Sequence, residues 1–313
     1  MPEIKNMEES KPFLKFEDIP VSTKTFIITT NIGLDIKEMF ENLPVTDYVT
    51  VPKRRGRKKK VQSVDPNRNL LEGSIITLEL CGNLRGTRLG KKRNKTEFFR
   101  NALTIVMFIE GKMLNFKVSA NGKFQMTGCK YDKQAEKCIK YMWKYIRKYC
   151  TNYKFQKEED EKNQYFQALF IPAMRNIDFN LGFVLDRAKL DEYFNTNTNY
   201  YSLLETSIGY TGVNIKFPVT RSITELRITE LISVGKKWYK PRLVSYKKYL
   251  SNLNHKERIK KLNKELDITF LVFHSGKTIC SGLCSEFARD SYYEFCNIIQ
   301  QNKAKFEEKL TVE

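Results

Sequence analysis

Catalytic and metal-binding residue types are scarce in this sequence. It has two histidines, His255 and His274, and none of its seven cysteines stands in a Cys-x-x-Cys pair. Zinc sites need clusters of such ligands, and no Gly-x-Ser-x-Gly nucleophile elbow is present either. Gly276-Lys277-Thr278 imitates the end of a P-loop, but Leu271 stands where that motif requires its first glycine. We therefore expect a protein that is not an enzyme and that uses no metal or cofactor.

Long apolar runs and paired cysteines are also missing. No stretch approaches the roughly 18 apolar residues of a membrane span, and Met1–Ser10 is charged, unlike a signal peptide. An odd number of cysteines argues against a disulfide framework and fits thiols that are kept reduced inside a cell. The sequence therefore predicts a soluble intracellular protein with no membrane partner.

Acidic residues are too few to balance the basic ones. The chain has 55 Lys and Arg against 36 Asp and Glu, a formal net charge of +19. Such an excess favours a polyanion, above all nucleic acid, as the partner. Much of the charge is concentrated in Lys53–Lys60 and in the segment 236–261. Because hydrophobic residues make up 41% of the chain, we expect this charge on a folded protein with a core.

A short pattern occurs twice, half a chain apart. The copies are Asn121-Gly-Lys-Phe-Gln-Met-Thr-Gly-Cys-Lys130 and Ser275-Gly-Lys-Thr-Ile-Cys-Ser-Gly-Leu-Cys284. Each begins with a Gly-Lys turn, alternates in residue type up to a hydroxyl-Gly pair, and precedes a segment of helical period. The recurrence of strand, turn and helix predicts a duplicated half-domain.

Apolar periodicity places strands and helices similarly in the two halves. First-half strands are predicted at 26–33, 74–81, 102–109, 112–119 and 122–128, with helices at 35–43 and 132–150. Second-half strands are predicted at 168–174, 181–185, 213–217, 226–234 and 267–273, with helices at 188–194 and 286–300. The charged segment 157–162 separates the halves. We expect an α+β fold in which an antiparallel sheet carries helices on one side and leaves its other face open.

The two copies lie in longer segments that resemble a known signature. Val118-Ser-Ala-Asn-Gly-Lys-Phe-Gln-Met-Thr-Gly-Cys-Lys130 and Phe270-Leu-Val-Phe-His-Ser-Gly-Lys-Thr-Ile-Cys-Ser-Gly282 look like Phe-x-Ser-Gly-Lys-x-x-x-Thr-Gly-Ala-Lys. TATA-box-binding proteins carry that pattern once per repeat. Asn31-Ile-Gly33 resembles their Asn-Leu-Gly turn, and Tyr210-Thr-Gly-Val resembles their Phe-Pro-Gly-Leu. The basic insertions resemble those of divergent TATA-binding-like proteins of large DNA viruses.

The resemblance implies a two-repeat saddle, a curved antiparallel sheet with helices on its convex side. Its concave face would lie in the minor groove of A·T-rich double-stranded DNA and kink it with apolar wedges. The repeats would span 21–156, with a basic insertion at 53–68, and 163–303, with one at 236–264, between tails at 1–20 and 304–313. The implied function is a general transcription factor that nucleates initiation at promoters. Its location would be the nucleus or, for a viral protein, a cytoplasmic replication factory or the virion.

The resemblance also assigns residues to DNA contact by their position. Phe273 would be a wedge and Tyr210 would stand in the place of the other second-repeat aromatic residue. Leu271 and Ile279 would contact the groove floor, while Ser281 and Thr127 would touch base acceptors. The further candidates for DNA contact are Gln125, Lys123, Lys130, Lys277, Arg55 and Arg57, the last two in an Arg-Gly-Arg that resembles an AT-hook core.

The first repeat departs from the family pattern. Lys117, Ser119 and Gln125 stand where Leu, Phe and Val are expected, and Thr25 stands where the family has Asn. No aromatic wedge is therefore assignable in this repeat, unless a shift of register by one residue brings Phe124 to the face. We expect any kinking of DNA to be lopsided.

Partner candidates and alternative functions complete the expectations. The family docks a TFIIB-like factor through its C-terminal stirrup and works with RNA polymerase machinery, which here points to Glu205, Leu203 and Leu204. A non-specific basic DNA- or RNA-binding protein would carry the same charge. Leu271 and Phe273 would equally suit a buried strand. Asp178 with Asp186, or Glu158 to Glu161, are conceivable metal carboxylates of an enzyme, although acids on a polar surface are usually solvated.

Overall fold

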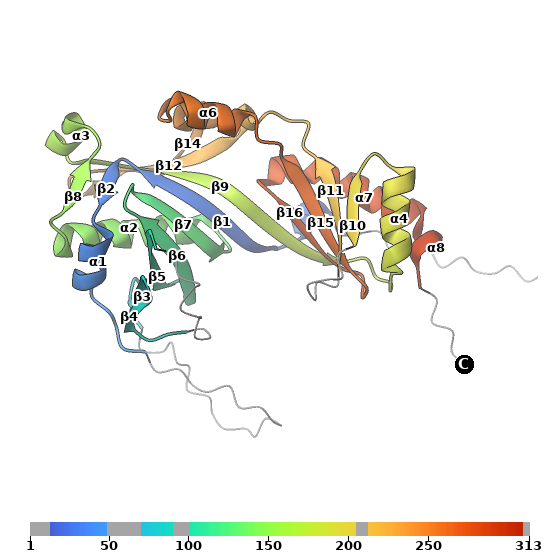
Figure 1. Cartoon of the computed structure of the whole chain (residues 1–313), viewed down its shortest axis with the longest axis horizontal. Coiled ribbons are helices and arrows are strands. Elements are labelled where there is room, and N and C mark those ends of the chain that lie inside the picture. Colours follow the sequence, from blue (N-terminus) through green and yellow to red (C-terminus); the bar gives the residue numbers. More distant parts are fainter. Residues whose placement is uncertain (1–12, 49–69, 90–99, 205–211, 309–313) are drawn as a thin grey trace, which may run out of the picture. The chain divides into compact units, whose positions relative to one another are not determined.

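The computed structural model describes residues 13–48, 70–89, 100–204 and 212–308, drawn in Figure 1. The chain forms two compact units. The first-half unit consists of Thr23–Ala173 and Ser222–Asn263, and the second-half unit consists of Met174–Arg221, Lys264–Glu313 and Met1–Ser22. The expected insertion 53–68 lies outside the described residues.

The first-half unit is built on an antiparallel sheet in the order β1-β7-β6-β5-β3-β4. Its strands are β1 (Val21–Thr30), β3 (Ile75–Leu80), β4 (Asn83–Gly86), β5 (Ala102–Ile109), β6 (Lys112–Ser119) and β7 (Lys123–Cys129). Its helices include α1 (Ile36–Asn42), α2 (Asp132–Tyr149) and α3 (Glu158–Lys162), and β2 (Ile32–Leu34) pairs with β8 (Tyr153–Phe155). The strands predicted at 102–109 and 112–119 and the long helix are confirmed to within one residue.

The segment 222–263 also belongs to the first-half unit. After the turn η2 (Ile223–Glu225), β12 (Arg227–Val234) pairs with the first part of β9 (Tyr165–Asn180). β13 (Lys237–Trp238) and β14 (Arg242–Ser245) both pair with β12, and two short helices follow, α5 (Tyr246–Ser251) and α6 (His255–Leu262). The basic segment expected at 236–264 is therefore a folded part of this unit.

The second-half unit has an antiparallel sheet in the order β10-β11-β15-β16-β9. Its strands are β10 (Tyr201–Leu204), β11 (Gly212–Pro218), β15 (Asp267–Phe273), β16 (Lys277–Gly282) and the later part of β9. Its helices are η1 (Phe16–Asp18), α4 (Arg187–Asn197), α7 (Ser285–Gln301) and α8 (Lys303–Phe306). Helix α7 confirms the prediction at 286–300.

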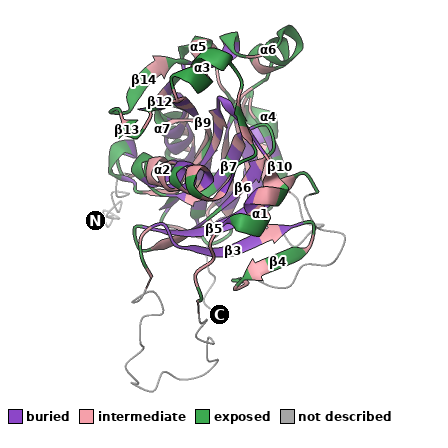
Figure 2. Ribbon diagram, turned by 90° about the vertical axis from the view of Figure 1, so that its left-hand side faces the viewer, coloured by how far each residue is buried: buried purple, intermediate pink, exposed green. Residues whose placement is uncertain are grey.

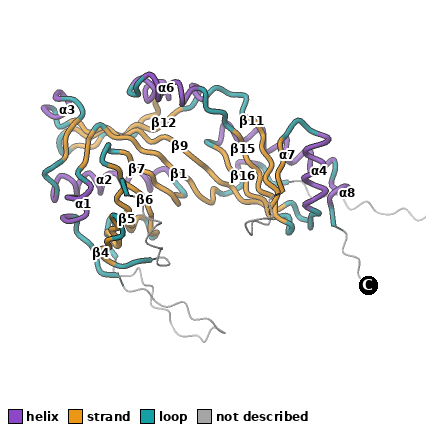
Figure 3. Tube along the Cα trace, viewed as in Figure 1, coloured by secondary structure: helices purple, strands orange, loops and turns teal. Residues whose placement is uncertain are grey.

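The two units repeat one pattern of elements, which can be followed in Figure 3. The first runs β1, α1, β3, β5, β6, β7, α2, and the second runs β9, α4, β10, β11, β15, β16, α7. The sheet orders correspond as well, because β1-β7-β6-β5-β3 matches β9-β16-β15-β11-β10. The expected α+β class, with antiparallel sheets and helices, is confirmed, and so is the duplication.

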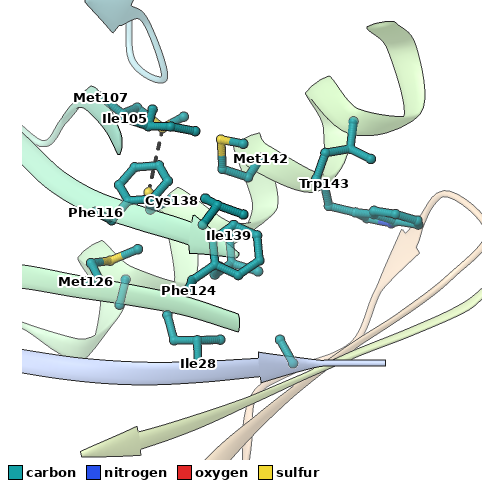
Figure 4. Close-up of a cluster of buried hydrophobic side chains, with 14 of the residues drawn as sticks. Ile28, Ile105, Met107, Phe116, Phe124, Met126, Cys138, Ile139, Met142 and Trp143 are labelled. Atoms are coloured by element: carbon teal, nitrogen blue, oxygen red, sulfur yellow. Dashed lines mark hydrogen bonds between the residues drawn. The ribbon is translucent and has the colours of Figure 1, made fainter. Parts of the chain in front are cut away.

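Helix α2 covers one face of the first-half sheet because its apolar residues recur at helical spacing. The buried residues of the helix are Gln134, Ala135, Cys138, Ile139, Met142, Trp143 and Ile146. Figure 4 shows Cys138, Ile139 and Met142 of the helix beside strand residues that include Ile28, Phe116 and Phe124. Figure 2 shows β3 and β5 almost wholly buried. Strand side chains alternate between faces, so this packing assigns every other residue to the helix side.

The second-half core is dominated by aromatic rings. Phe270 of β15 and Phe295 of α7 stack with centroids 4.2 Å apart and planes within 6°. Phe217 of β11 meets both rings edge-on, and Phe194 of α4 lies edge-on to Phe217 and stacked with Phe295. The predicted helix face Ala288, Tyr292, Phe295 and Ile299 is buried throughout. Each aromatic residue buries a large apolar area, so few residues suffice to hold the helix on the sheet.

Four local expectations differ from the structure. The strand predicted at 168–174 extends over Tyr165–Asn180 as β9, while 181–185 is a turn in which Gly182 has φ +87°. The charged segment 157–162 forms the short helix α3. The expected tails carry buried Phe16 and Phe306 in the described residues, because both rings pack on aromatic residues of the second-half unit.

A buried carboxylate anchors the segment 222–263 within the first-half unit. Glu230 of β12 is fully buried, and its two oxygens accept hydrogen bonds at 2.6 Å from Lys248 of α5 and from Arg242 of β14. Gln167 of β9 donates a third. Burial alone would raise the pKa of Glu230, but these hydrogen bonds hold it below its usual value.

Replacing this carboxylate should destabilise the unit. Glu230→Gln should lower the free energy of unfolding by about 1–3 kcal/mol at neutral pH, because two charge-assisted hydrogen bonds are lost. The folded-state pKa is lowered, so this contribution is complete above the unfolded pKa of about 4.3 and disappears as the pH falls through the folded value. Denaturant unfolding at neutral and acid pH measures it. Glu265→Gln, at an exposed position, should have little effect; equal losses in the two variants would contradict the assignment.

Candidate nucleic-acid interface

The open face of the second-half sheet, defined as the face away from α7, carries half-buried apolar side chains. Phe270 and Val272 of β15 are buried towards the helix, whereas Leu271 and Phe273 alternate with them and are half-buried. Ile279 and Ser281 of β16 have the same parity. The structure therefore brings together the predicted set Leu271, Phe273, Ile279 and Ser281 on one face.

Strand register arranges this face in rows of neighbours. One row crosses all five strands and consists of Leu203, Asn214, Leu271, Ile279 and Asp178. The next row consists of Tyr201, Lys216, Thr269, Ser281 and Asn176. Directly opposed residues in a sheet lie about 5 Å apart, so each row forms a continuous surface.

The open face of the first-half sheet has the same register but different chemistry. Its equivalent row consists of Ile27, Gln125, Lys117, Thr104 and Glu79. The pair Lys117 and Gln125 therefore stands where the second-half unit has Leu271 and Ile279. Thr127 is exposed on the same face, and its hydroxyl donates to the carbonyl of Asn115 at 3.3 Å. At the positions of Lys117 and Gln125, this face offers polar groups where its counterpart offers apolar ones.

The register excludes Phe124 from the open face. Its neighbours Lys123 and Gln125 alternate with it, and the Phe124 ring is buried towards α2. The expectation that a shift of register might make Phe124 a wedge is wrong, because the shift would expose the apolar face of β7.

The two Gly-Lys turns have one geometry in both units. Gly122 (φ +70°) and Gly276 (φ +77°) each donate from their N–H to the carbonyl three residues earlier, at 3.0 and 2.9 Å. Their carbonyls accept from Thr30 and from Leu181. A side chain has no room: a Cβ would lie 2.0 Å from the Ile32 carbonyl oxygen at Gly122 and 2.4 Å from that of Phe183 at Gly276. The repeated motif is therefore required by close backbone contact at the edge of each face.

The remaining candidates are distributed unevenly. Lys123 is half-buried on the open face, while Lys130 and Lys277 are exposed; no carboxylate of the described residues forms an ion pair with any of the three. Leu203, 43% exposed, lies on the open face, whereas Leu204 has the opposite parity on β10. The other predicted residues, Tyr210, Glu205, Arg55 and Arg57, lie outside the described residues.

Asp178 and Asp186, which were considered as metal ligands, have different surroundings. Asp186 caps α4, accepting from the N–H groups of Ala188 and Lys189 at 3.0 and 3.1 Å, and Asp178 lies on the open face. Within the described ranges, no group of three or more His, Cys, Asp or Glu side chains is placed to hold a metal ion. None of the described helices is long and apolar enough to cross a membrane.

A second basic surface lies on the helix side of the first-half unit. A cavity of about 840 Å³ opens between α2 and the β12–β13 hairpin. Its cationic lining residues are Lys137, Lys140, Lys144, Arg147, Lys148 and Lys236, and its aromatic ones are Tyr141, Trp143 and Trp238. The buried Trp143 indole N–H has no acceptor among the described residues. Lys137 forms ion pairs with Glu72 and Glu110, and no described carboxylate pairs with the other five cations.

Comparison with known proteins adds a viral likeness. No protein-family model matches the sequence. It is 22% identical over 298 residues to "Uncharacterized protein 335L" of Invertebrate iridescent virus 6, a match that covers 92% of this chain and 86% of that one. It is 26% identical over 233 residues to the "TATA-box-binding protein-like" protein of Acanthamoeba polyphaga mimivirus, covering 68% of this chain and 58% of that protein. Among solved structures, Methanococcus jannaschii TBP aligns with 90% of this chain and 98% of its own, at a TM-score of 0.41 and 12% identity.

Several residues of the two faces escaped the sequence analysis. Asn214, Asn176 and Lys216 share the second-half face with the predicted set, and Ile27 and Asn115 share the first-half face. The sequence shows which residues of one strand share a face. It does not show which residues of different strands are neighbours, because that depends on pairing between strands distant in the chain.

The two motif glycines should respond alike to substitution. Gly122→Ala and Gly276→Ala each add a Cβ in the left-handed region and against a carbonyl oxygen. Gly111 provides the matched control, because it has φ +73° and nothing within 4 Å of its Cβ position. Gly111→Ala should cost roughly 1–2 kcal/mol of unfolding free energy, and the two motif variants should each cost clearly more. Chemical denaturation measures this; equal losses in all three would show that the close contacts do not matter.

Proposed function

We propose that this protein binds double-stranded promoter DNA in the minor groove through its open sheet faces and acts as a general transcription factor without catalysis. The observation that carries the proposal is the row containing Leu271 and Ile279, with Phe273 beside it. These apolar side chains are held half-exposed by a sheet whose other face is buried. Apolar residues that enter the minor groove unstack base steps and kink the duplex. Their side chains are then removed from water, so the cost of exposing them in the free protein is recovered on binding.

Two further observations support a nucleic-acid partner. The net charge of +19 favours phosphate neutralisation as a source of affinity. The mimivirus relative is described as TATA-box-binding protein-like. We therefore propose A·T-rich double-stranded DNA as the ligand. A TFIIB-like factor and RNA polymerase machinery are the partners that this function would need. Since Leu203 and Leu204 lie on opposite faces of β10, a partner docked on one face of the strand would contact only one of them.

The wedge role of Phe273 gives a direct test on DNA. Phe273→Ala should weaken duplex binding by roughly 1–3 kcal/mol, the scale of a lost base-stacking contact, and should reduce the bend. Ser119→Ala should leave both unchanged, because the first-half face has no wedge at that position. Bending is measured by fluorescence transfer between labels on the two ends of an A·T-rich duplex.

The control for this test is another exposed apolar residue of the second-half unit. Leu14 is 62% exposed, and its carbonyl accepts a hydrogen bond from Tyr292 of α7, so it lies on the helix side. Leu14→Ala should therefore bind and bend DNA like the unmodified protein. An unchanged bend in folded Phe273→Ala would remove the observation on which the proposal depends.

A second candidate function is sequence-independent nucleic-acid binding at the basic cavity beside α2. Lysines and aromatic rings that share one groove suit phosphates and stacked bases. Lys140, Lys144 and Lys148 follow one side of α2 at intervals of four residues and line the cavity with Trp238. Here Lys140 lies 5.7 Å from the Trp238 ring centroid. This surface lies on the opposite side of the sheet from Gln125 and Lys117.

Salt dependence separates the two functions. Replacing Lys140, Lys144 and Lys148 together by Ala should reduce the slope of log K against log salt for single-stranded RNA by about 0.7 per lost contact. The bend of an A·T-rich duplex should not change. Lys133→Ala, at an exposed α2 position outside the cavity lining, is the control. A slope unaffected by the triple substitution would exclude the cavity as a nucleic-acid site.

A further inference from the structure

An acidic side chain stands at one end of the proposed DNA-binding row. Asp178 of β9 is exposed on the open face and lies directly opposite Ile279. The Ser22 hydroxyl donates to one of its carboxylate oxygens at 3.1 Å. Across the described residues, no Lys or Arg forms an ion pair with it, and no hydrogen bond other than that from Ser22 reaches it. The carboxylate therefore retains free acceptor capacity towards anything that covers this face.

Two asparagine side chains on this face also lack a hydrogen-bond donor. Asn176 precedes Asp178 by two residues on the same face of β9, and Asn214 lies three strands away in the row of Asp178. The side-chain oxygens of both are buried without a hydrogen-bond donor. Buried polar atoms are nearly always satisfied in folded proteins, so two such oxygens on one face point to a donor that comes with a ligand.

The chemistry of the minor groove gives this donor an identity. A·T and T·A pairs present only the acceptors of adenine N3 and thymine O2, whereas a G·C pair adds the exocyclic N2 amino group of guanine, which is a donor. A carboxylate against an A·T edge would face acceptors and lose its water without compensation. In the first-half unit, the place of Asp178 is taken by Ile27, which makes no such distinction.

We propose that Asp178, with Asn176 beside it on β9, forms a subsite that accepts the guanine N2 amino group and so selects one G·C pair within the DNA site. The inference rests on the proposed function, because it requires the second-half face to lie in the minor groove. It names a specificity determinant: an A·T-rich site with one G·C pair on the side of the second-half unit.

Inosine substitution tests the subsite through a single functional group. Inosine lacks the N2 amino group of guanine and keeps its major-groove edge. A G·C pair is moved through an otherwise A·T duplex, and each guanine is then replaced by inosine. The full chain should prefer one G·C position by about ten-fold, the scale of one base-specific contact, and inosine at that position should abolish the preference.

Protein variants connect the preference to the carboxylate. Asp178→Asn should lose the penalty for inosine while still binding the A·T duplex, because an amide both donates and accepts. Asp178→Ile should imitate Ile27 and bind all the duplexes alike. Asp290→Asn makes the same charge change at an exposed position on α7 and should keep the preference. Thermal unfolding of each variant checks that the fold is intact.

The failures of this inference and of the proposed function are distinguishable. Duplex binding and bending with no effect of inosine at any position would overturn the subsite and leave the proposed function standing. Absence of binding to every duplex would overturn both. Binding of an arginine-rich peptide that is lost in Asp178→Asn, with no effect of inosine, would show that the acceptors serve a basic protein partner and would overturn the subsite.

Discussion

One-sided burial of the second-half sheet is the constraint on which its candidate interface depends. Side chains alternate across a strand, so the stack of Phe270 on Phe295 fixes the register of β15 for every other residue. A slip by one residue would expose Phe270 and Val272 and bury Leu271 and Phe273. The aromatic core that stabilises the unit thus also determines which side chains face outward. The core and the candidate interface therefore consist of alternate residues of the same strands.

The same constraint explains how two copies of one pattern acquired different surfaces. Helix-side positions must remain apolar in both units, because they fill the cores beneath α2 and α7. Open-face positions do not have to be apolar. Lys117 and Gln125 occupy in the first-half unit the positions that Leu271 and Ile279 occupy in the second-half unit. Exposed apolar area costs roughly 25 cal/mol per Å², so its retention on one unit alone needs a reason that folding does not provide. Recognition of an asymmetric ligand by an internally repeated protein is such a reason.

Periodicity predicted the elements that alternate cleanly and failed where tertiary contacts decide. Helix α2 and strand β6 were found because their apolar residues follow a single period, and β5 was found because its continuous apolar run ends at the Glu110-Gly111 turn. Strand β9 was cut short at Met174 because the polar residues that follow it, Arg175 and Asn176, resemble a boundary. The motif placed Leu271 and Ile279 on one face, but Asp178 joined their row only through strand pairing. Nothing in the sequence distinguished buried Glu230 from the exposed acids.

The segment 222–263 contains all but the last residue of the basic stretch expected at 236–264, and its packing makes it part of the first-half unit. The chain changes unit at Ser22/Thr23, Ala173/Met174, Arg221/Ser222 and Asn263/Lys264, so neither unit is one stretch of sequence. Removing the segment would take away β12, the partner of β9, together with part of the basic cavity. The end of α5 also shares a polar cavity of about 390 Å³ with Thr29 and Lys123 of the first-half face. The unit whose open face has no aromatic residue at the wedge position is thus the one that holds this basic segment.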